Sequence, residues 1–144
     1  MRLLSWNVQG LGGHLFKRMR GRLRLELQTV LVGGQIDVLL LQEHHLNECR
    51  SRSYGSILQG RWITYWSFGI GPYGSNAGVC MSINAKWKNQ IIDYVEVISS
   101  RAQYVVFKLK DIRFGCLNIY ALNRVRKRIE FWSFLCETLP ILEN

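Results

Sequence analysis

A short apolar run that ends in a carboxylate constrains the fold of this chain more than any other feature. Residues 38–41 (VLLL) follow a pair of glycines and are closed by Gln42 and Glu43. Such a run between turn-forming residues is typical of a strand buried on both faces, in a sheet that helices cover. Ligands of such sheets bind beyond the strand ends, which makes Glu43 a candidate functional acid. Taken alone, an acid at a strand end is more often a solvated surface residue.

Composition predicts one folded domain with a polyanionic partner. The chain has 144 residues, of which 48% are hydrophobic, and a net charge of +9 from 19 Lys and Arg against 10 Asp and Glu. This excess favours nucleic acid first and an acidic membrane surface second. The basic residues form two groups, Lys17, Arg18, Arg20, Arg22 and Arg24, and Arg124, Arg126, Lys127 and Arg128. Arg18, Arg22, Arg124 and Arg126 are the candidate nucleic-acid contacts, with two solvated helix faces as the alternative.

Cysteine usage favours an intracellular protein, with the nucleus as one candidate compartment. The four cysteines are far apart, and the amino terminus lacks the features of a signal peptide. A zinc site at His44, His45 and Cys49 is disfavoured, because adjacent histidines on a strand point to opposite sides. No apolar run approaches the length that a membrane span requires, so we expect a soluble protein.

The first part of the chain has the pattern strand, helix, strand. Residues 2–8 alternate like a strand, residues 16–31 have a helical apolar stripe, and the buried strand that ends at Glu43 follows. A crossover of this kind is right-handed and joins parallel neighbours. The carboxyl ends of the two strands should therefore meet, with Asn7 and Glu43 facing the same small volume.

The rest of the chain predicts strands and one last helix. Strands are expected over residues 62–68, 76–84, 90–98, 103–109 and 112–121, with no helix among them, and a helix over 126–139 that Pro140 ends. Residues 69–74 match Gly-x-Gly-x-x-Gly, but a strand follows instead of the helix that a dinucleotide site needs. The predicted fold class is α/β, a mixed sheet with helices on one face. Its other face is left uncovered, as though a sandwich partner were missing.

Four polar residues stand where predicted strands give way to loops: Asn7, Glu43, Tyr120 and Asn123. An acid can bind a hard divalent ion, amides can orient a phosphate, and a phenol can hydrogen-bond an anionic oxygen. Together they suit metal-assisted hydrolysis of a phosphodiester. A buried tyrosine followed by an asparagine turn is also a common purely structural feature.

Three segments resemble a known superfamily in order and spacing. Residues 5–11 (SWNVQGL), 40–43 (LLQE) and 117–123 (LNIYALN) resemble the first three motifs of the endonuclease/exonuclease/phosphatase superfamily. The closest resemblance is to apurinic/apyrimidinic-like endonuclease domains of plant LINE-type retrotransposons. Residues 128–132 also look like the helix that follows the third motif there.

This resemblance implies a fold and a set of roles. The fold would be the first half of a four-layer α-β-β-α sandwich, with residues 1–144 a truncated domain and the second half absent. Glu43 would bind Mg²⁺, or Mn²⁺, and Asn7 would order the metal or the phosphate. Tyr120 and Asn123 would contact the scissile phosphate of DNA.

Departures from the family pattern limit the expected activity. The resemblance implies later motifs, Gly-Asp-x-Asn and Ser-Asp-His, that this sequence does not contain. Gln9 also stands where repair enzymes of the family have an acid, Leu122 replaces a proline, and His44-His45 replace the commoner Thr-Lys. We therefore expect a fragment of a Mg²⁺-dependent endonuclease of retroelement origin that is inactive without a C-terminal half-domain.

Two other functions are also compatible with the sequence. One is a non-catalytic nucleic-acid-binding remnant that uses its basic helices, with Trp62, Tyr65 and Trp66 available for base stacking. The other keeps the superfamily but changes the substrate to a small phosphate ester such as a phosphoinositide.

Overall fold

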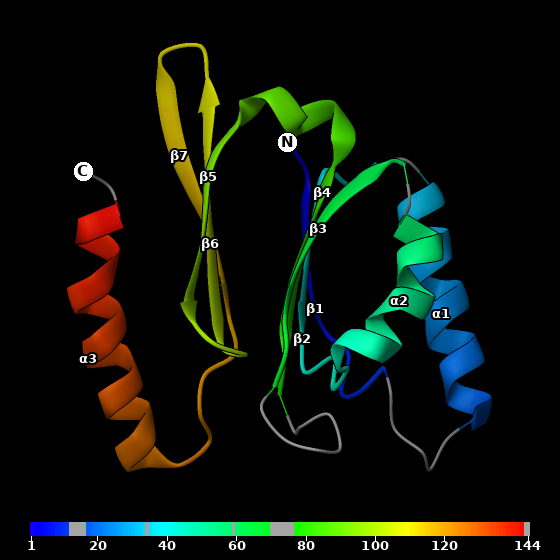
Figure 1. The fold of residues 1–144 in the computed structure, drawn as a ribbon, viewed down its shortest axis with the longest axis horizontal. Coiled ribbons are helices and arrows are strands. Elements are labelled where there is room, and N and C mark those ends of the chain that lie inside the picture. The colour runs from blue at the N-terminus through cyan, green and yellow to red at the C-terminus, as the bar shows by residue number, and fades with distance from the viewer. Residues whose placement is uncertain (12–16, 34, 59, 70–76, 143–144) are drawn as a thin grey trace.

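Four layers make up the structure, with two β-sheets face to face between helices (Figure 1). The computed structural model describes residues 1–11, 17–33, 35–58, 60–69 and 77–142. Helices α1 (Lys17–Val32) and α2 (Glu48–Leu58) cover the outer face of one sheet, and α3 (Val125–Leu142) covers the outer face of the other. The predicted α/β class is confirmed.

The first sheet contains the strand that ends at Glu43. Its order is β1 (Leu3–Asn7), β2 (Val38–Gln42), β4 (Val79–Asn84) and β3 (Trp62–Ser67). β1 runs parallel to β2, as the strand-helix-strand pattern predicted, and the other two pairings are antiparallel. Every residue of β2 is buried. Asn7 pairs with Gln42 at the carboxyl ends of the two parallel strands, which places Glu43 one residue beyond that pair.

The second sheet corrects the prediction of one sheet with an uncovered face. β5 (Ile91–Ile98), β6 (Ala102–Leu109) and β7 (Ile112–Ile119) form a separate antiparallel sheet that packs against the first. A 3₁₀ helix, η1 (Ala85–Gln90), follows β4 and carries the chain from one sheet to the other. The face that seemed to lack a partner is therefore covered by strands of the same chain.

Three apolar clusters hold the four layers together. One joins α1 and α2 to the first sheet, one lies between the sheets, and one joins α3 to the second sheet. Buried members of each include, in that order, Leu27, Leu39 and Leu41; Val38, Met81, Ile83 and Phe107; and Ala102, Phe131 and Leu135. Burying one such large side chain is worth about 1.5–3 kcal/mol.

Two helix predictions need correction. α2 was not expected, because its sequence, ECRSRSYGSIL, is mostly polar. It is anchored by Tyr54, which is 7% exposed and donates a hydrogen bond from its hydroxyl to the Leu11 carbonyl over 2.8 Å. α3 continues through Pro140 to Leu142, so the prediction that Pro140 ends it is wrong. So near a helix end, a missing N–H affects only the last turn.

A polar clamp, made of the buried residues Gln42 and Asn118 and the exposed Ser5, joins the two sheets. Gln42 Nε2 donates to Asn118 Oδ1 over 2.7 Å and to Ser5 Oγ over 3.1 Å. Asn118 Nδ2 donates to the carbonyl oxygens of Leu41 and Cys80 over 3.1 and 3.0 Å. The clamp fixes the position of β7 against β2, so Glu43 and Tyr120, which lie just beyond it, come to the same edge of the sandwich.

Candidate functional site

Asn7 and Glu43 meet at the carboxyl ends of the two parallel strands. Asn7 Nδ2 donates to Glu43 Oε1 over 2.7 Å, and Asn7 Oδ1 accepts from the backbone N–H of Gln9 over 3.1 Å. The second bond fixes which end of the amide faces Glu43. The carboxylate therefore has a fixed orientation, yet its side chain stays 22% exposed and open to a ligand.

Tyr120 reaches the same place from the other sheet. It follows β7, its backbone N–H donates to the Arg101 carbonyl over 2.8 Å, and its phenol hydrogen-bonds with Glu43. Burial raises the pKa of Tyr120, the Glu43 carboxylate raises it further, and Arg101 opposes both effects. The phenol is therefore protonated at neutral pH and can donate to an anionic oxygen.

Arg101 is a site residue that the sequence reasoning missed. Its guanidinium carbon lies 4.6 Å from the centre of the Tyr120 ring, in the geometry of a cation–π contact. Arg101 stands just before β6, and Ala102 pairs with Ile119. Counting back along the β6–β7 hairpin from its turn at Lys110 and Asp111 would have placed Arg101 opposite Tyr120. The residue adds a cation beside an acid, an amide and a phenol.

The two histidines after Glu43 occupy different environments. His45 Nε2 lies 3.7 Å from Glu43 Oε2, so protonation of His45 would place a positive charge next to the carboxylate. His44 is fully buried, and burial lowers its pKa to about 4. His44 is therefore neutral at neutral pH and belongs to the scaffold beneath the site.

No described contact joins the remaining predicted site residues to Asn7, Glu43 and Tyr120. Asn123 is exposed in the turn before α3, and among the described interactions none joins it to Asn7, Glu43 or Tyr120. Arg124 is also exposed, and Arg126 forms a surface ion pair with Glu130 over 3.5 Å. The side chains of Arg18 and Arg22 fall outside the described part of the structure.

The aromatic residues proposed for base stacking are partly buried and take part in packing. Trp62 and Trp66 pack against the cluster between the first sheet and its helices. Tyr65 stacks on Tyr94 between the sheets, with ring centres 4.1 Å apart. Each ring therefore leaves only part of its surface open to a base.

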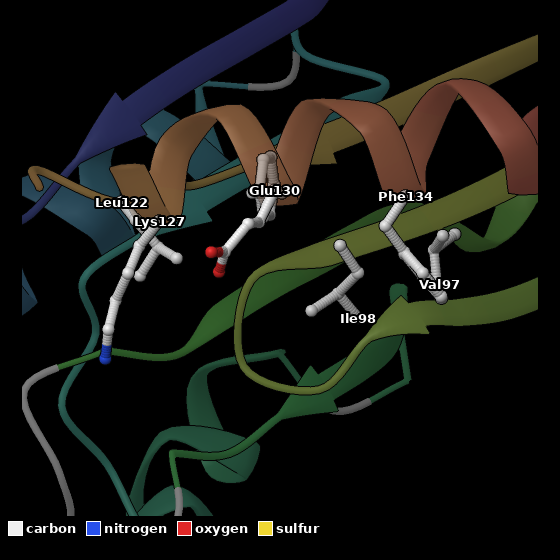
Figure 2. A pocket seen from close by; sticks show the side chains of 7 residues that line it. Val97, Ile98, Leu122, Lys127, Glu130 and Phe134 are labelled. Atoms are coloured by element: carbon white, nitrogen blue, oxygen red, sulfur yellow. The ribbon is translucent and has the colours of Figure 1, made fainter. Parts of the chain in front are cut away.

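One hollow in the structure is apolar and belongs to a different region. It has a volume of about 450 Å³ and lies between α3 and the β5–β6 end of the second sheet (Figure 2). Its lining is Val97, Ile98, Leu122, Lys127, Glu130, Phe131 and Phe134. Because Asn7, Glu43 and Tyr120 are not part of this lining, the hollow is separate from the place where these three residues meet.

Glu43 fits a divalent cation, but only as one of several ligands. Within the described residues, no group of three or more His, Cys, Asp and Glu side chains could hold a metal ion. Mg²⁺ is usually bound by one or two carboxylates, with water and substrate phosphate completing its shell. A partly exposed carboxylate that Asn7 holds in a fixed orientation meets that description as one of the ligands.

The titration of Tyr120 should report on its two charged neighbours with opposite signs. Glu43→Gln removes the anion and should lower the pKa of Tyr120, whereas Arg101→Met removes the cation and should raise it. Tyrosine ring ¹³C shifts followed by NMR from pH 8 to 12 would measure both changes. A Tyr120 pKa that moves in neither variant would contradict the contacts described above.

Comparison with known proteins finds similarity at the level of structure. No protein-family model matches the chain, and no curated protein matches it. An AP endonuclease from Leishmania major aligns with a TM-score of 0.61 and 17% identity, over 90% of this chain and 43% of that one. An endonuclease/exonuclease/phosphatase family protein from Leptotrichia buccalis C-1013-b aligns with a TM-score of 0.59 and 13% identity, over 92% of this chain and 60% of that one.

The shared part is a fraction of each solved structure, since the chain spans less than two thirds of either protein. Among the described helices, none combines the length and the apolarity that crossing a bilayer demands. Over the part that it spans, this chain has the fold of the endonuclease/exonuclease/phosphatase proteins.

Proposed function

We propose that this chain forms one wall of a metal-dependent phosphodiesterase site that acts on DNA. The observation that carries the proposal is the meeting of Asn7, Glu43, Tyr120 and Arg101 at one edge of the sandwich. Two of these residues come from each sheet. The AP endonuclease with a similar fold and the net charge of +9 both favour a nucleic acid substrate.

Each residue has a role that follows from its contacts. Glu43 would hold Mg²⁺ or Mn²⁺, which when bound supplies a Lewis acid for the phosphate. Asn7 fixes the orientation of that carboxylate. Tyr120, with its raised pKa, would donate its proton in a hydrogen bond to a phosphate oxygen, and Arg101 would balance the negative charge that develops there.

We further propose that these residues do not suffice for hydrolysis. Neither histidine next to Glu43 is positioned as a free base, because His44 is buried and His45 lies against the carboxylate. A general base typically contributes about 10²- to 10⁴-fold to such a rate. A complementary half-domain would supply it, as in a divided or truncated endonuclease of LINE-type retroelement origin that acts in the nucleus.

Loss of the Glu43 charge should abolish the binding of a divalent cation. Titration of Mn²⁺ followed by electron paramagnetic resonance would measure its affinity for the original chain and for Glu43→Gln. Glu48→Gln is the matched control, because Glu48 is a well-exposed acid paired with Arg52 on the surface. Equal Mn²⁺ affinity for the original chain and Glu43→Gln would contradict the proposed metal site.

Substrate assays would separate the competing functions. We expect the chain alone to leave supercoiled plasmid intact in Mg²⁺; nicking that Glu43→Gln abolishes would show instead that it is sufficient. DNA affinity that falls steeply with salt concentration but is the same with and without Mn²⁺ at Glu43 would favour the non-catalytic alternative. Hydrolysis of inositol phosphates would move the substrate class from DNA to small esters.

A further inference from the structure

His44 is packed on all sides directly after the proposed metal ligand. It is 0% exposed and meets the rings of Trp66 and Phe68 edge-on, with centres 5.2 and 6.0 Å away. Its Nδ1 accepts from the Leu46 N–H over 3.0 Å, so the proton must be on Nε2, which donates to the Ser67 carbonyl over 3.1 Å. Both ring nitrogens are therefore used: the Nδ1 bond lies within the segment after Glu43, and the Nε2 bond ties that segment to β3.

Gly78 provides the space that this ring needs. A Cβ atom at residue 78 would lie 2.6 Å from His44 Nε2 and 2.8 Å from Nδ1, well inside van der Waals contact. Gly78 also has φ +109°, a conformation that other residues rarely adopt. The absence of a side chain at Gly78 thus leaves the space that the His44 ring occupies.

The backbone around Glu43 is held from both sides. On one side Gly10 N–H donates to the Glu43 carbonyl over 2.7 Å, and Leu11 N–H donates to the His44 carbonyl over 2.8 Å. On the other side His45 N–H donates to the Ala77 carbonyl over 3.0 Å. The turn is joined both to the segment after β1 and to the segment before β4.

Glu43 itself has an unfavourable backbone conformation that needs such support. Its φ is +55° and that of His45 is +52°, in the left-handed region that costs a non-glycine residue about 1–2 kcal/mol. Such conformations persist only where the surroundings determine them. The fully buried ring of His44 lies between these two residues and forms part of those surroundings.

We infer that His44 is a positioning residue that holds the Glu43 carboxylate toward Asn7 and Tyr120. The contacts above establish its hold on the turn, and its consequence for a cation rests on the proposed function. Without the ring, Glu43 would relax to an ordinary backbone conformation and its carboxylate would turn away from Asn7 Nδ2. No contact of His44 with substrate is needed for this role.

Two measurements on a set of variants would test the inference. The first is Mn²⁺ affinity. The second is the hydrogen-exchange rate of the Gly10 amide, which donates to the Glu43 carbonyl and so reports on the Glu43 turn in the absence of metal. His44→Leu and Gly78→Ala should each lower Mn²⁺ affinity about 10- to 100-fold, the effect typical of residues that support a metal ligand. Both variants should also raise the exchange rate of the Gly10 amide. This increase should be at least tenfold greater than the increase for the amides of β6.

Partial rescue and a matched control separate positioning from stability. His44→Gln keeps a donor near Nε2 and His44→Asn an acceptor near Nδ1, so each should retain more Mn²⁺ affinity than His44→Leu. They also carry the test if His44→Leu does not fold. Ile83→Ala is the control, because Ile83 is buried in the core beside Val38, at the opposite end of β2. It should leave Mn²⁺ affinity unchanged, and it should not change the ratio of Gly10 exchange to exchange in β6.

The outcomes distinguish this inference from the proposed function. Unchanged Gly10 exchange in His44→Leu, or an equal loss in Ile83→Ala, would overturn the positioning role. If the original chain binds no Mn²⁺ through Glu43 but Gly10 exchange still responds to His44→Leu and not to Ile83→Ala, the metal site is wrong and the positioning role stands.

Discussion

Asn118→Ala is expected to lower the free energy of unfolding by about 2–4 kcal/mol. The side chain is 1% exposed and is bonded to Gln42 and to the carbonyls of Leu41 and Cys80. Its removal deprives the buried Gln42 amide of an acceptor and two carbonyl oxygens of a donor, and a buried group left unsatisfied costs roughly 1–3 kcal/mol. Urea denaturation followed by tryptophan fluorescence would measure the loss.

The same substitution at Asn123 provides the control. Asn123 is exposed in the turn before α3, and surface changes of this kind usually stay within about 0.5 kcal/mol. Comparable losses from Asn118→Ala and Asn123→Ala would mean that the clamp between the sheets contributes nothing beyond an ordinary asparagine.

Gly115→Ala should cost about 1–3 kcal/mol through overpacking within the second sheet. A Cβ atom at residue 115 would overlap the ring of Tyr104, which is 7% exposed and lies across the glycine from the neighbouring strand. The ring cannot swing freely into solvent, so strand or ring must shift.

A double-mutant cycle would assign that cost to the ring. In a Tyr104→Leu background the space over residue 115 is larger, so Gly115→Ala should cost much less than in the original chain. Thermal and urea unfolding of the four proteins would supply the numbers. An identical cost in both backgrounds would place the strain somewhere other than this contact.

Local patterns in the sequence predicted most elements but not their stacking. The alternation in residues 2–8, the helical stripe in residues 16–31 and the apolar run before Glu43 predicted β1, α1 and β2 in the right order. Each pattern of hydrophobic residues indicates which side chains are buried. The alternation of β5 and β6 also revealed a buried face. It could not reveal that this face packs on β2 and β4 of the same chain, since hydrophobic periodicity carries no information on which surface a strand meets.

The site was predicted in part for a similar reason. The rule that functional residues gather at strand ends led to Asn7, Glu43 and Tyr120, three residues that the structure brings together. Arg101 was missed because a single arginine in a polar turn has no periodic signal, and only the hairpin register shows that it faces Tyr120. The scaffold role of His44 depends on contacts with Ser67 and Gly78, far along the chain, which no local pattern encodes.

The division of the site between two sheets makes its geometry sensitive to shear. Asn7 and Glu43 are attached to one sheet, and Arg101 and Tyr120 to the other, so a slide between the layers would separate the phenol from the carboxylate. Side chains such as Met81 and Phe107, which are buried in the cluster between the two sheets, therefore help to hold the two halves of the site in place.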